Sequence, residues 1–172
     1  MNTLVLLLVG MAAFLLQTTL LRHVLPPFLV PDPTLLLVLF ASIAFPFGRG
    51  LVASFLLGLF ADMLSGAPEG WNALFAMCLF LINRSILERI FLKRSRSALG
   101  LFLLDFALKL PYLVLLTTLF GFPLPSPEWV LTIWAGEGIT SLLLMPLLFR
   151  LLTEILGFQT FRWLTLKHTG AR

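Results

Sequence analysis

The residues of this chain that could do chemistry are the few polar side chains inside long apolar stretches. Asp62 is the first of them, near the end of an apolar helix within residues 48–74, GRGLVASFLLGLFADMLSGAPEGWNAL. Such groups are costly in a membrane and often functional. We expect Gln17 to reach the same depth and to donate a hydrogen bond to the Asp62 carboxylate. The alternative is that Asp62 lies at a wetted membrane interface and helps to end its helix.

A row of small residues leads to this carboxylate. Gly50, Ser54, Gly58 and Asp62 recur every four residues, so they follow one face of a helix. Small residues on such a face let another helix backbone approach closely inside a membrane. The row therefore predicts a face on which a transmembrane helix packs, and a partner's helix is one candidate.

Four more charged residues, Arg84, Asp105, Lys109 and Glu137, also lie within apolar segments. Arg84 and Asp105 are about equally far from the basic loop between their segments, so the sequence predicts an ion pair between them. Lys109 lies near mid-membrane and is expected to reach Glu137. A proton or ion relay is one interpretation. We favour a structural role, because attraction between buried charges mainly offsets their desolvation.

The sequence contains no arrangement typical of an enzyme. It has no Ser/His/Asp set, no cluster with metal-ligand spacing, no phosphate-binding glycine loop and no nucleotide motif. We therefore expect no catalysis, no metal and no cofactor. The net charge of +4 could suggest nucleic acid, but the basic residues collect between apolar segments, where they indicate topology and lipid contacts. Nucleic-acid binding is accordingly excluded.

Composition predicts one integral membrane domain over residues 1–172. The chain is 59% hydrophobic and 12% charged, far from the balance of soluble domains. Six apolar segments are expected to be transmembrane helices in an all-α polytopic fold: residues 3–21, 34–47, 51–64, 71–91, 98–120 and 130–156. The second and third are about 14 residues each, short for a span, and residues 48–50 are expected to separate them. Pro111 predicts a kink in the fifth.

Charge asymmetry predicts how these segments are oriented. Six crossings place both termini on one side, with most of the basic residues: Arg49, Lys93, Arg94, Arg96, Arg162, Lys167 and Arg172. The opposite loops carry Arg22 and three acidic residues. Because basic loops stay in the cytoplasm, both termini are predicted to be cytoplasmic.

The ordered motifs of the first half resemble the rod shape-determining protein MreD family. They are QTTLL at 17–21, Pro-Asp at 31–32, a G-x-G turn and a G-L-x-x-D-x-x-S-G-x-x-x-G-x-x-A-L pattern that falls on Gly58, Leu59, Asp62, Ser65, Gly66, Gly70, Ala73 and Leu74. The second half agrees in length and hydrophobic outline. On this resemblance, nine residues are assigned to the family motif or to partner docking: Gln17, Asp32, Gly50, Ser54, Gly58, Asp62, Ser65, Gly66 and Gly70.

The resemblance implies a non-catalytic inner-membrane subunit of the bacterial cell-elongation machinery, which controls peptidoglycan synthesis and cell shape. The implied closest partner is MreC, a single-span coiled-coil protein, in a wider assembly with MreB, RodA and a class B penicillin-binding protein. The family also resembles the substrate-binding subunits of energy-coupling factor transporters. The alternative function is therefore vitamin binding in such a transporter, which requires a ligand-sized cavity with convergent polar groups. Gln17, Asp62, Asn72 and Glu137 are candidates for those groups.

Overall fold

Helices and their connecting turns make up the part of the chain that the computed structural model describes, residues 2–65, 68–90, 95–121 and 126–157. In chain order the elements are α1 (Asn2–Leu16), a π-helical turn η1 (Gln17–Leu21), α2 (Arg22–Val24), a 3-10 turn η2 (Pro27–Leu29), α3 (Pro33–Ala44), α4 (Phe47–Ser65), α5 (Trp71–Ile90), α6 (Ser95–Phe120) and α7 (Pro127–Leu156). No strand lies in these ranges, so the expected all-α class is confirmed.

Five helical segments are long and apolar enough to cross a membrane: Thr3–Leu21, Pro27–Ala44, Phe47–Ser65, Ala98–Phe120 and Glu128–Leu156. The chain is therefore a multi-pass membrane protein. α5 is outside this group, although it has 20 residues, because Asn83, Arg84, Glu88 and Arg89 make its second half polar.

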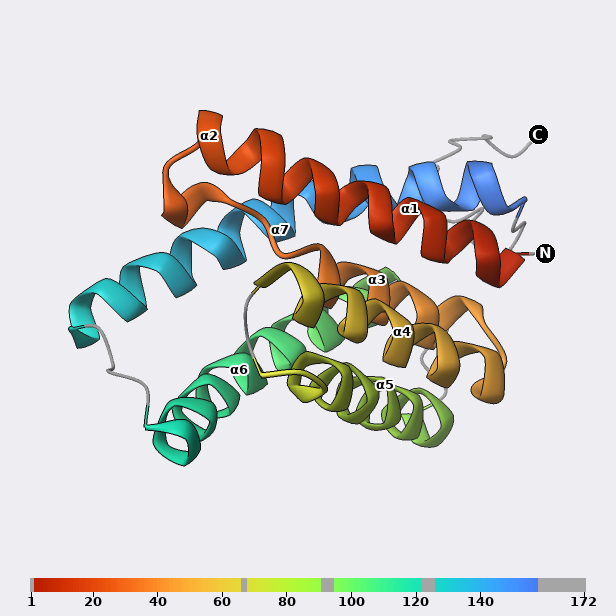
Figure 1. Cartoon of the computed structure of the whole chain (residues 1–172). Helices are drawn as coiled ribbons and strands as arrows, with labels where there is room; N and C mark the ends of the chain where they lie inside the picture. Colours follow the sequence, from red (N-terminus) through yellow and green to blue (C-terminus); the bar gives the residue numbers. More distant parts are fainter. Residues whose placement is uncertain (1, 66–67, 91–94, 122–125, 158–172) are drawn as a thin grey trace, which may run out of the picture.

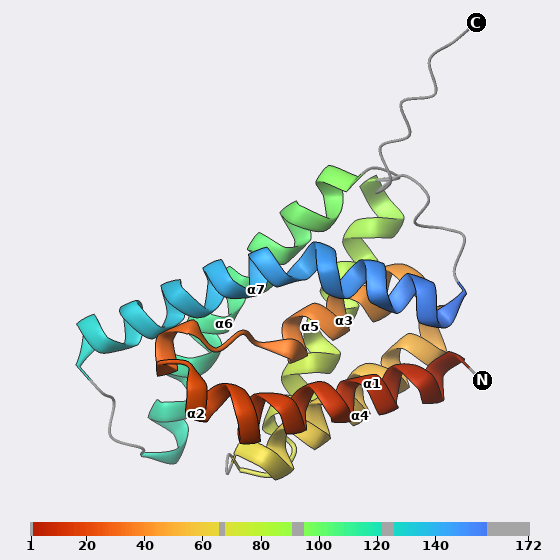
Figure 2. The same cartoon turned by 90° about the horizontal axis from the view of Figure 1, so that it is seen from above.

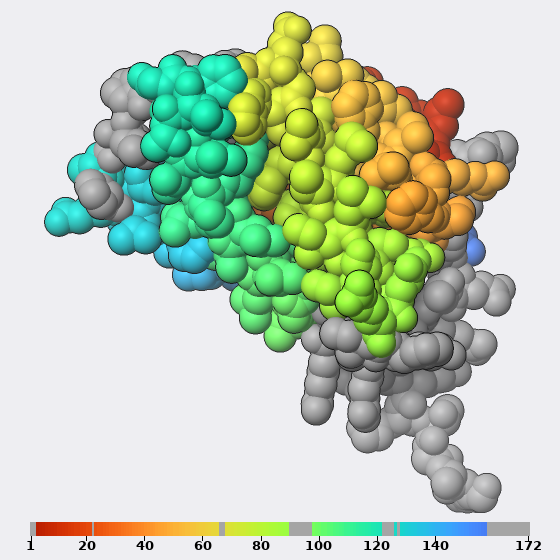
Figure 3. All heavy atoms as spheres, turned by 90° about the horizontal axis from the view of Figure 1, so that it is seen from below, coloured from red at the N-terminus to blue at the C-terminus, as the bar shows by residue number. Residues whose placement is uncertain are grey.

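Successive long helices run in opposite directions, so that α1 begins and α7 ends at the same end of the bundle (Figure 1). α1 and α7 lie on one side of the molecule, with the chain between α2 and α3 running between them (Figure 2). On the opposite face, α5 lies between α4 and α6 (Figure 3). The basic residues Lys93, Arg94, Arg162, Lys167 and Arg172, which carry much of the topology prediction, lie outside the described residues.

α3 is the central helix of the bundle. It contacts α1, α4, α5, α6 and α7, and its residues 35–42 are all buried. Twelve residues span only about 18 Å at the rise of an α-helix, so α3 is shorter than the hydrocarbon core. Neighbouring helices shield its sides, which is how such a short apolar helix is accommodated.

The boundary between the second and third predicted segments was placed wrongly. The break lies at Phe45 and Pro46, and Gly48–Gly50 belong to the first turn of α4. Phe45 is extended, with φ −105° and ψ 151°, as expected for a residue that precedes proline. Because the Pro46 carbonyl accepts from the Gly50 N–H at 2.9 Å, the new helix starts at once. α4 thus has 19 residues instead of about 14, while α3 is as short as predicted.

Candidate functional site

The Asp62 carboxylate caps the N-terminus of α5. Its Oδ2 accepts hydrogen bonds from the backbone N–H groups of Gly70 at 3.0 Å and Ala73 at 3.1 Å. Its Oδ1 accepts from the Asn72 N–H at 2.9 Å. The first N–H groups of a helix have no partner within the helix, and the helix dipole favours a negative charge there. Asp62 is only 2% exposed, so these three bonds are what make its burial tolerable.

These bonds overturn the predicted hydrogen bond between Gln17 and Asp62. Both carboxylate oxygens are occupied by backbone donors of α5, and Gln17 makes no hydrogen bond with Asp62 among the described residues. The alternative of a wetted interfacial aspartate is equally wrong, because the side chain is buried. Sequence spacing could not distinguish a neighbouring side chain from the backbone of the next helix.

Gly58 and Gly70 complete the helical hairpin of α4 and α5. A Cβ added at Gly58 would overlap the backbone of Asn72 and Ala73, so this glycine allows the two helices to touch. Gly70 has a φ of +91°, a left-handed conformation that glycine adopts without strain. The family pattern from Gly58 to Leu74 therefore specifies a tight hairpin; Gly66, another member of the pattern, lies outside the described residues.

The row of small residues on α4 faces the interior of the chain. Gly50, Ser54, Gly58 and Asp62 are all buried. A Cβ at Gly50 would overlap the Phe80 ring of α5, as one at Gly58 would overlap the α5 backbone. The predicted close packing of a second helix on this row is confirmed. The helix is α5 of the same chain, so the row is not a free docking face for a partner.

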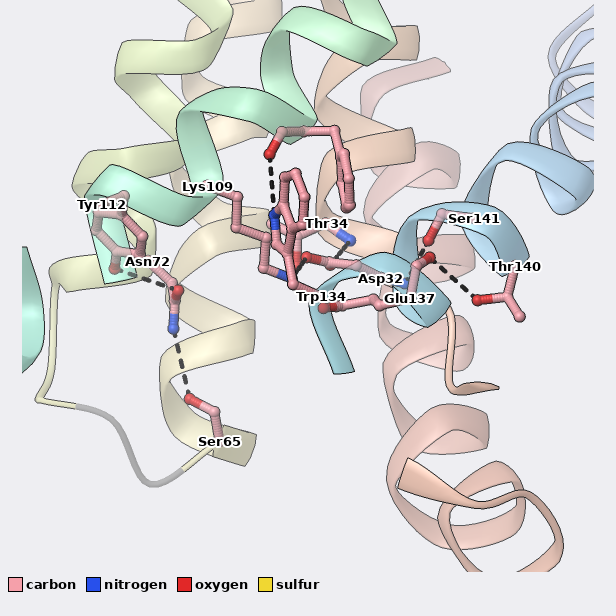
Figure 4. Close-up of polar contacts among 11 residues, drawn as sticks. Asp32, Thr34, Ser65, Asn72, Lys109, Tyr112, Trp134, Glu137, Thr140 and Ser141 are labelled. Atoms are coloured by element: carbon pink, nitrogen blue, oxygen red, sulfur yellow. Dashed lines mark hydrogen bonds and ion pairs between the residues drawn. The ribbon is translucent and has the colours of Figure 1, made fainter. Parts of the chain in front are cut away.

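A second polar cluster joins α6, α7 and the start of α3 through Lys109. Lys109 Nζ lies 2.6 Å from Asp32 Oδ2 and 2.5 Å from Glu137 Oε1 (Figure 4). The predicted contact between Lys109 and Glu137 is thus confirmed. The side chains of Asp32, Lys109 and Glu137 are only 13%, 17% and 17% exposed. We call these three residues the charged triad.

Sequence analysis missed Asp32 as a member of the triad and singled it out only as a motif residue. Asp32 is the N-cap of α3: its Oδ1 accepts from the Thr34 N–H at 2.8 Å, and Pro33 follows at the first helical position. Its own N–H donates to Ser141 Oγ of α7 at 2.9 Å. An aspartate before proline is a helix-start signal. That signal could have indicated that the charge lies where α3 begins, inside the bundle.

A segment with extended residues and the short 3-10 turn η2 leads from α2 to this N-cap and packs against α7. Leu25 and Pro26 are extended, and a short 3-10 turn follows them. A Cβ at Gly136 of α7 would overlap the carbonyl oxygen of Phe28, so the glycine permits close contact. Irregular backbone at membrane depth is tolerated only where protein covers it or where it lines a water-filled cavity. Here α7 covers the backbone at Phe28, and Pro27 and Val30 line the cavity described next.

Two stacked aromatic pairs flank the triad. Trp134 of α7 stacks on Phe106 of α6 with ring centroids 4.2 Å apart, and its Nε1–H donates to the Phe106 carbonyl at 3.3 Å. Phe75 of α5 stacks on Tyr112 of α6 at 4.0 Å. The Tyr112 hydroxyl donates to Asn72 Oδ1 at 3.4 Å (Figure 4). These contacts hold the middle of α6, which includes Lys109, against α5 and α7.

The triad lines a cavity of about 370 Å³. The cavity lies at the end of the bundle where α1 and α4 end and α5 begins. Its polar lining residues are Gln17, Thr18, Asp32, Thr34, Ser65, Asn72, Lys109 and Glu137, and its apolar ones are Phe14, Pro27, Val30, Ala61, Leu64 and Ile133. Gln17 belongs to the π-helical turn η1, an irregularity that is frequent at functional sites. Of the predicted ligand-binding groups, Gln17, Asn72 and Glu137 meet here, and Asp62 does not line the cavity.

A model of the rod shape-determining protein MreD family matches residues 1–155 of the chain. The chain belongs to this family. The match extends through α7, beyond the first half that carries the motifs recognised in the sequence. No curated protein and no solved structure matches the chain. For this member of the MreD family, the geometry above therefore gives the motif residues their roles: Gly58, Asp62 and Gly70 build a hairpin, and Asp32 joins the charged triad.

The ion pair predicted between Arg84 and Asp105 is wrong. Arg84 Nε pairs with Glu88 one turn further along α5, at 2.7 Å. Asp105 Oδ2 instead accepts from Asn83 Nδ2 at 2.7 Å. The prediction from equal depth placed the contact between α5 and α6 one residue away from its true position. Asn83, rather than the neighbouring Arg84, makes the contact with α6. A second pair of this i, i+4 kind joins Arg150 and Glu154 on α7 at 3.0 Å.

The contact of Asn83 with Asp105 leaves two buried oxygens without a partner. Both side chains are fully buried, and Asn83 Oδ1 and Asp105 Oδ1 make no hydrogen bond with any described residue. Buried polar atoms are normally paired, because leaving one unpaired costs about 1–3 kcal/mol. The pair fastens α5 to α6, and it is a point at which the sequence is not optimised for stability.

Proposed function

We propose that this chain is a non-catalytic subunit of the bacterial elongation complex, in which it binds MreC and supports control of peptidoglycan synthesis and cell shape. The observation that carries the proposal is the match of the family model over residues 1–155. The wider assembly would contain MreB, RodA and a class B penicillin-binding protein. The polar residues of the family motif build the fold of the chain itself, which fits a role in assembly.

The proposed location is the inner membrane, with six crossings and both termini in the cytoplasm. α5 is taken as the sixth crossing, because its 20 residues run antiparallel to α4 and α6 in the same layer (Figure 3). Its charged residues stand in its second half, at the end of the bundle where α1 begins and α4 begins. That end also carries Arg49, as the positive-inside rule requires for the cytoplasmic side.

A partner helix would have to dock outside the α4 row, which α5 occupies. Of the exposed apolar surfaces that remain, the stripes on α1 and α7 are taken as the candidates, and each is long enough to contact one transmembrane helix. On α1 the stripe consists of Leu4, Leu8, Met11 and Leu15, and on α7 of Ile139, Leu143, Leu147, Leu151 and Ile155. Membrane lipid covers whichever stripe carries no partner.

The test is affinity purification of the full chain, in mild detergent, from cells that also express MreC. We expect recovery of MreC in stoichiometric amounts. Leu8→Trp and Leu143→Trp keep each stripe apolar but obstruct a docked helix, and one of the two is expected to reduce recovery severalfold. Exposed Val114 on α6 provides the matched control, Val114→Trp. Absence of MreC from the unmodified complex would contradict the proposal.

The second candidate is a vitamin-binding subunit of an energy-coupling factor transporter. The cavity beside the charged triad favours it, because its volume and mixed lining fit a small molecule. The same purification separates the two candidates. Recovery of ATPase subunits together with a bound vitamin would support the transporter, whereas recovery of MreC supports the elongation complex.

A further inference from the structure

We propose that the cavity lined by the charged triad binds the primary ammonium group of an amphipathic amine. The amine could be a soluble alkylamine or the headgroup of a lipid such as phosphatidylethanolamine. The proposal concerns the isolated chain and does not rest on its place in the elongation complex.

The charge of the site is the first argument. Among the residues that the structure describes, the charged ones that line the cavity are Asp32, Lys109 and Glu137. Together they carry one net negative charge when ionised. An uncompensated charge at membrane depth is costly, and membrane proteins normally pair such groups. An ammonium group bound beside the triad would neutralise this charge, and in a zwitterionic lipid the phosphate would then lie outside the triad. An uncharged or anionic group bound there would leave the imbalance or increase it.

The free polar atoms are the second argument. Lys109 already contacts both carboxylates, Asp32 through Oδ2 and Glu137 through Oε1. Two of its three N–H donors are thus in use, and a ligand's phosphate or carboxylate would meet the two carboxylates together with the lysine. Glu137 Oε2 and the Gln17 amide make no hydrogen bond with any other described residue. Both residues line the cavity and carry acceptor oxygens, and an ammonium group is a donor with three hydrogens and no acceptor.

The apolar wall is the third argument, and it determines the rest of the ligand. Phe14, Val30, Leu64 and Ile133 surround the polar groups, so the body of the ligand should be aliphatic. The volume of about 370 Å³ lies at the small end of the range for small-molecule sites. It is sufficient for a headgroup with the first part of a chain. The competing interpretation is that the charged triad is rigid and purely structural, and that the cavity holds only water.

The test uses the purified full chain in nanodiscs made of phosphatidylcholine, which has no primary ammonium group. Hexylamine is titrated by calorimetry, with hexanol as the uncharged match. In a second arm, phosphatidylethanolamine replaces half of the lipid, and retained lipid is identified by native mass spectrometry. We expect saturable binding in at least one arm. Binding of hexylamine alone identifies a soluble amine, and selective retention of phosphatidylethanolamine alone identifies the lipid.

Two variants connect the binding to the site. Glu137→Gln removes the net negative charge and should weaken binding at least tenfold, while Glu154→Gln, on the exposed end of the same helix, should leave it unchanged. Because Glu137→Gln could also impair folding, Gln17→Leu is a second variant. The Gln17 side chain makes no hydrogen bond with the described residues, so its replacement should weaken binding severalfold without changing the melting temperature. Equal binding of hexanol, binding unaffected by both variants, or no saturable binding in either arm would overturn the proposal.

Discussion

Two buried aspartates in this chain have opposite surroundings. Asp62 accepts three backbone N–H bonds at the start of α5, so its charge is matched by donors and by the helix dipole. Asp105 accepts one bond from Asn83, and its other oxygen has no partner among the described residues. The negative charge is therefore useful at Asp62 and not at Asp105.

The same substitution should consequently have different effects at the two positions. Asp62→Asn puts an NH₂ group against a backbone donor and loses at least one hydrogen bond, which should destabilise the fold by about 1–3 kcal/mol. Asp105→Asn keeps an acceptor for Asn83 Nδ2 and supplies a donor for Asn83 Oδ1, so stability should be unchanged or higher. Thermal unfolding in detergent, followed by tryptophan fluorescence, measures both variants. Equal loss of stability in the two would refute this distinction.

Sequence analysis could predict contacts between oppositely charged side chains better than contacts with the backbone. It predicted Lys109 with Glu137, since two unlike charges at similar depth have few other partners in a membrane. It failed at Asp62, because no pattern shows that a carboxylate faces the N–H groups of the following helix. It also failed at Asp105. The predicted partner was Arg84, chosen because it lies at similar depth, but the neutral residue before it, Asn83, makes the contact.

At the scale of elements, the hairpin of α4 and α5 depends on close contact at Gly58. The backbone of Gly58 lies against the backbone of Asn72 and Ala73, so there is no space for a Cβ at this position. The same hairpin brings Asp62 to the start of α5. A shift of either helix would break the cap and the contact together, so this pair of helices should behave as one unit.

We therefore expect Gly58→Ala to lower the melting temperature by several degrees and to reduce the amount of folded protein. Gly100→Ala is the matched control: it also lies within a helix, α6, and a Cβ there meets nothing within 4 Å. Alanine has the higher intrinsic helix propensity, so the control should be neutral or slightly stabilising. Equal behaviour of the two variants in size-exclusion chromatography and thermal unfolding would show that close approach at Gly58 is unimportant.

The boundary between the second and third predicted segments was wrong because glycine was taken as a break. Gly48 and Gly50 were taken as a turn, but Pro46 ends α3 and the glycines continue α4. Glycine is tolerated in membrane helices, so it is a weak boundary signal there. The burial of residues 35–42 of α3 also depends on five surrounding helices, which local sequence does not specify.

On the scale of the whole molecule, the charged triad connects parts that are far apart in the sequence. Asp32 precedes α3, Lys109 is in α6 and Glu137 is in α7. The Asp32 N–H and Ser141 add a further bond between α7 and the start of α3. Lys109 thus holds the second half of the chain against the central helix. Of the described residues that line the cavity, it is the one with a positive charge.

Removing this charge should weaken the whole assembly of helices. Lys109→Met leaves two carboxylates close together without a cation, and breaking a buried ion pair on one side typically costs about 3–5 kcal/mol. The exposed pair of Arg150 and Glu154 provides the control, since Arg150→Met should have little effect. In the double variant Lys109→Met/Glu137→Met one carboxylate is removed as well, so part of the stability should return. The midpoint of thermal unfolding measures all three. A double variant no more stable than Lys109→Met would show that Lys109 acts through packing, because only the electrostatic explanation predicts recovery when Glu137 is also neutralised.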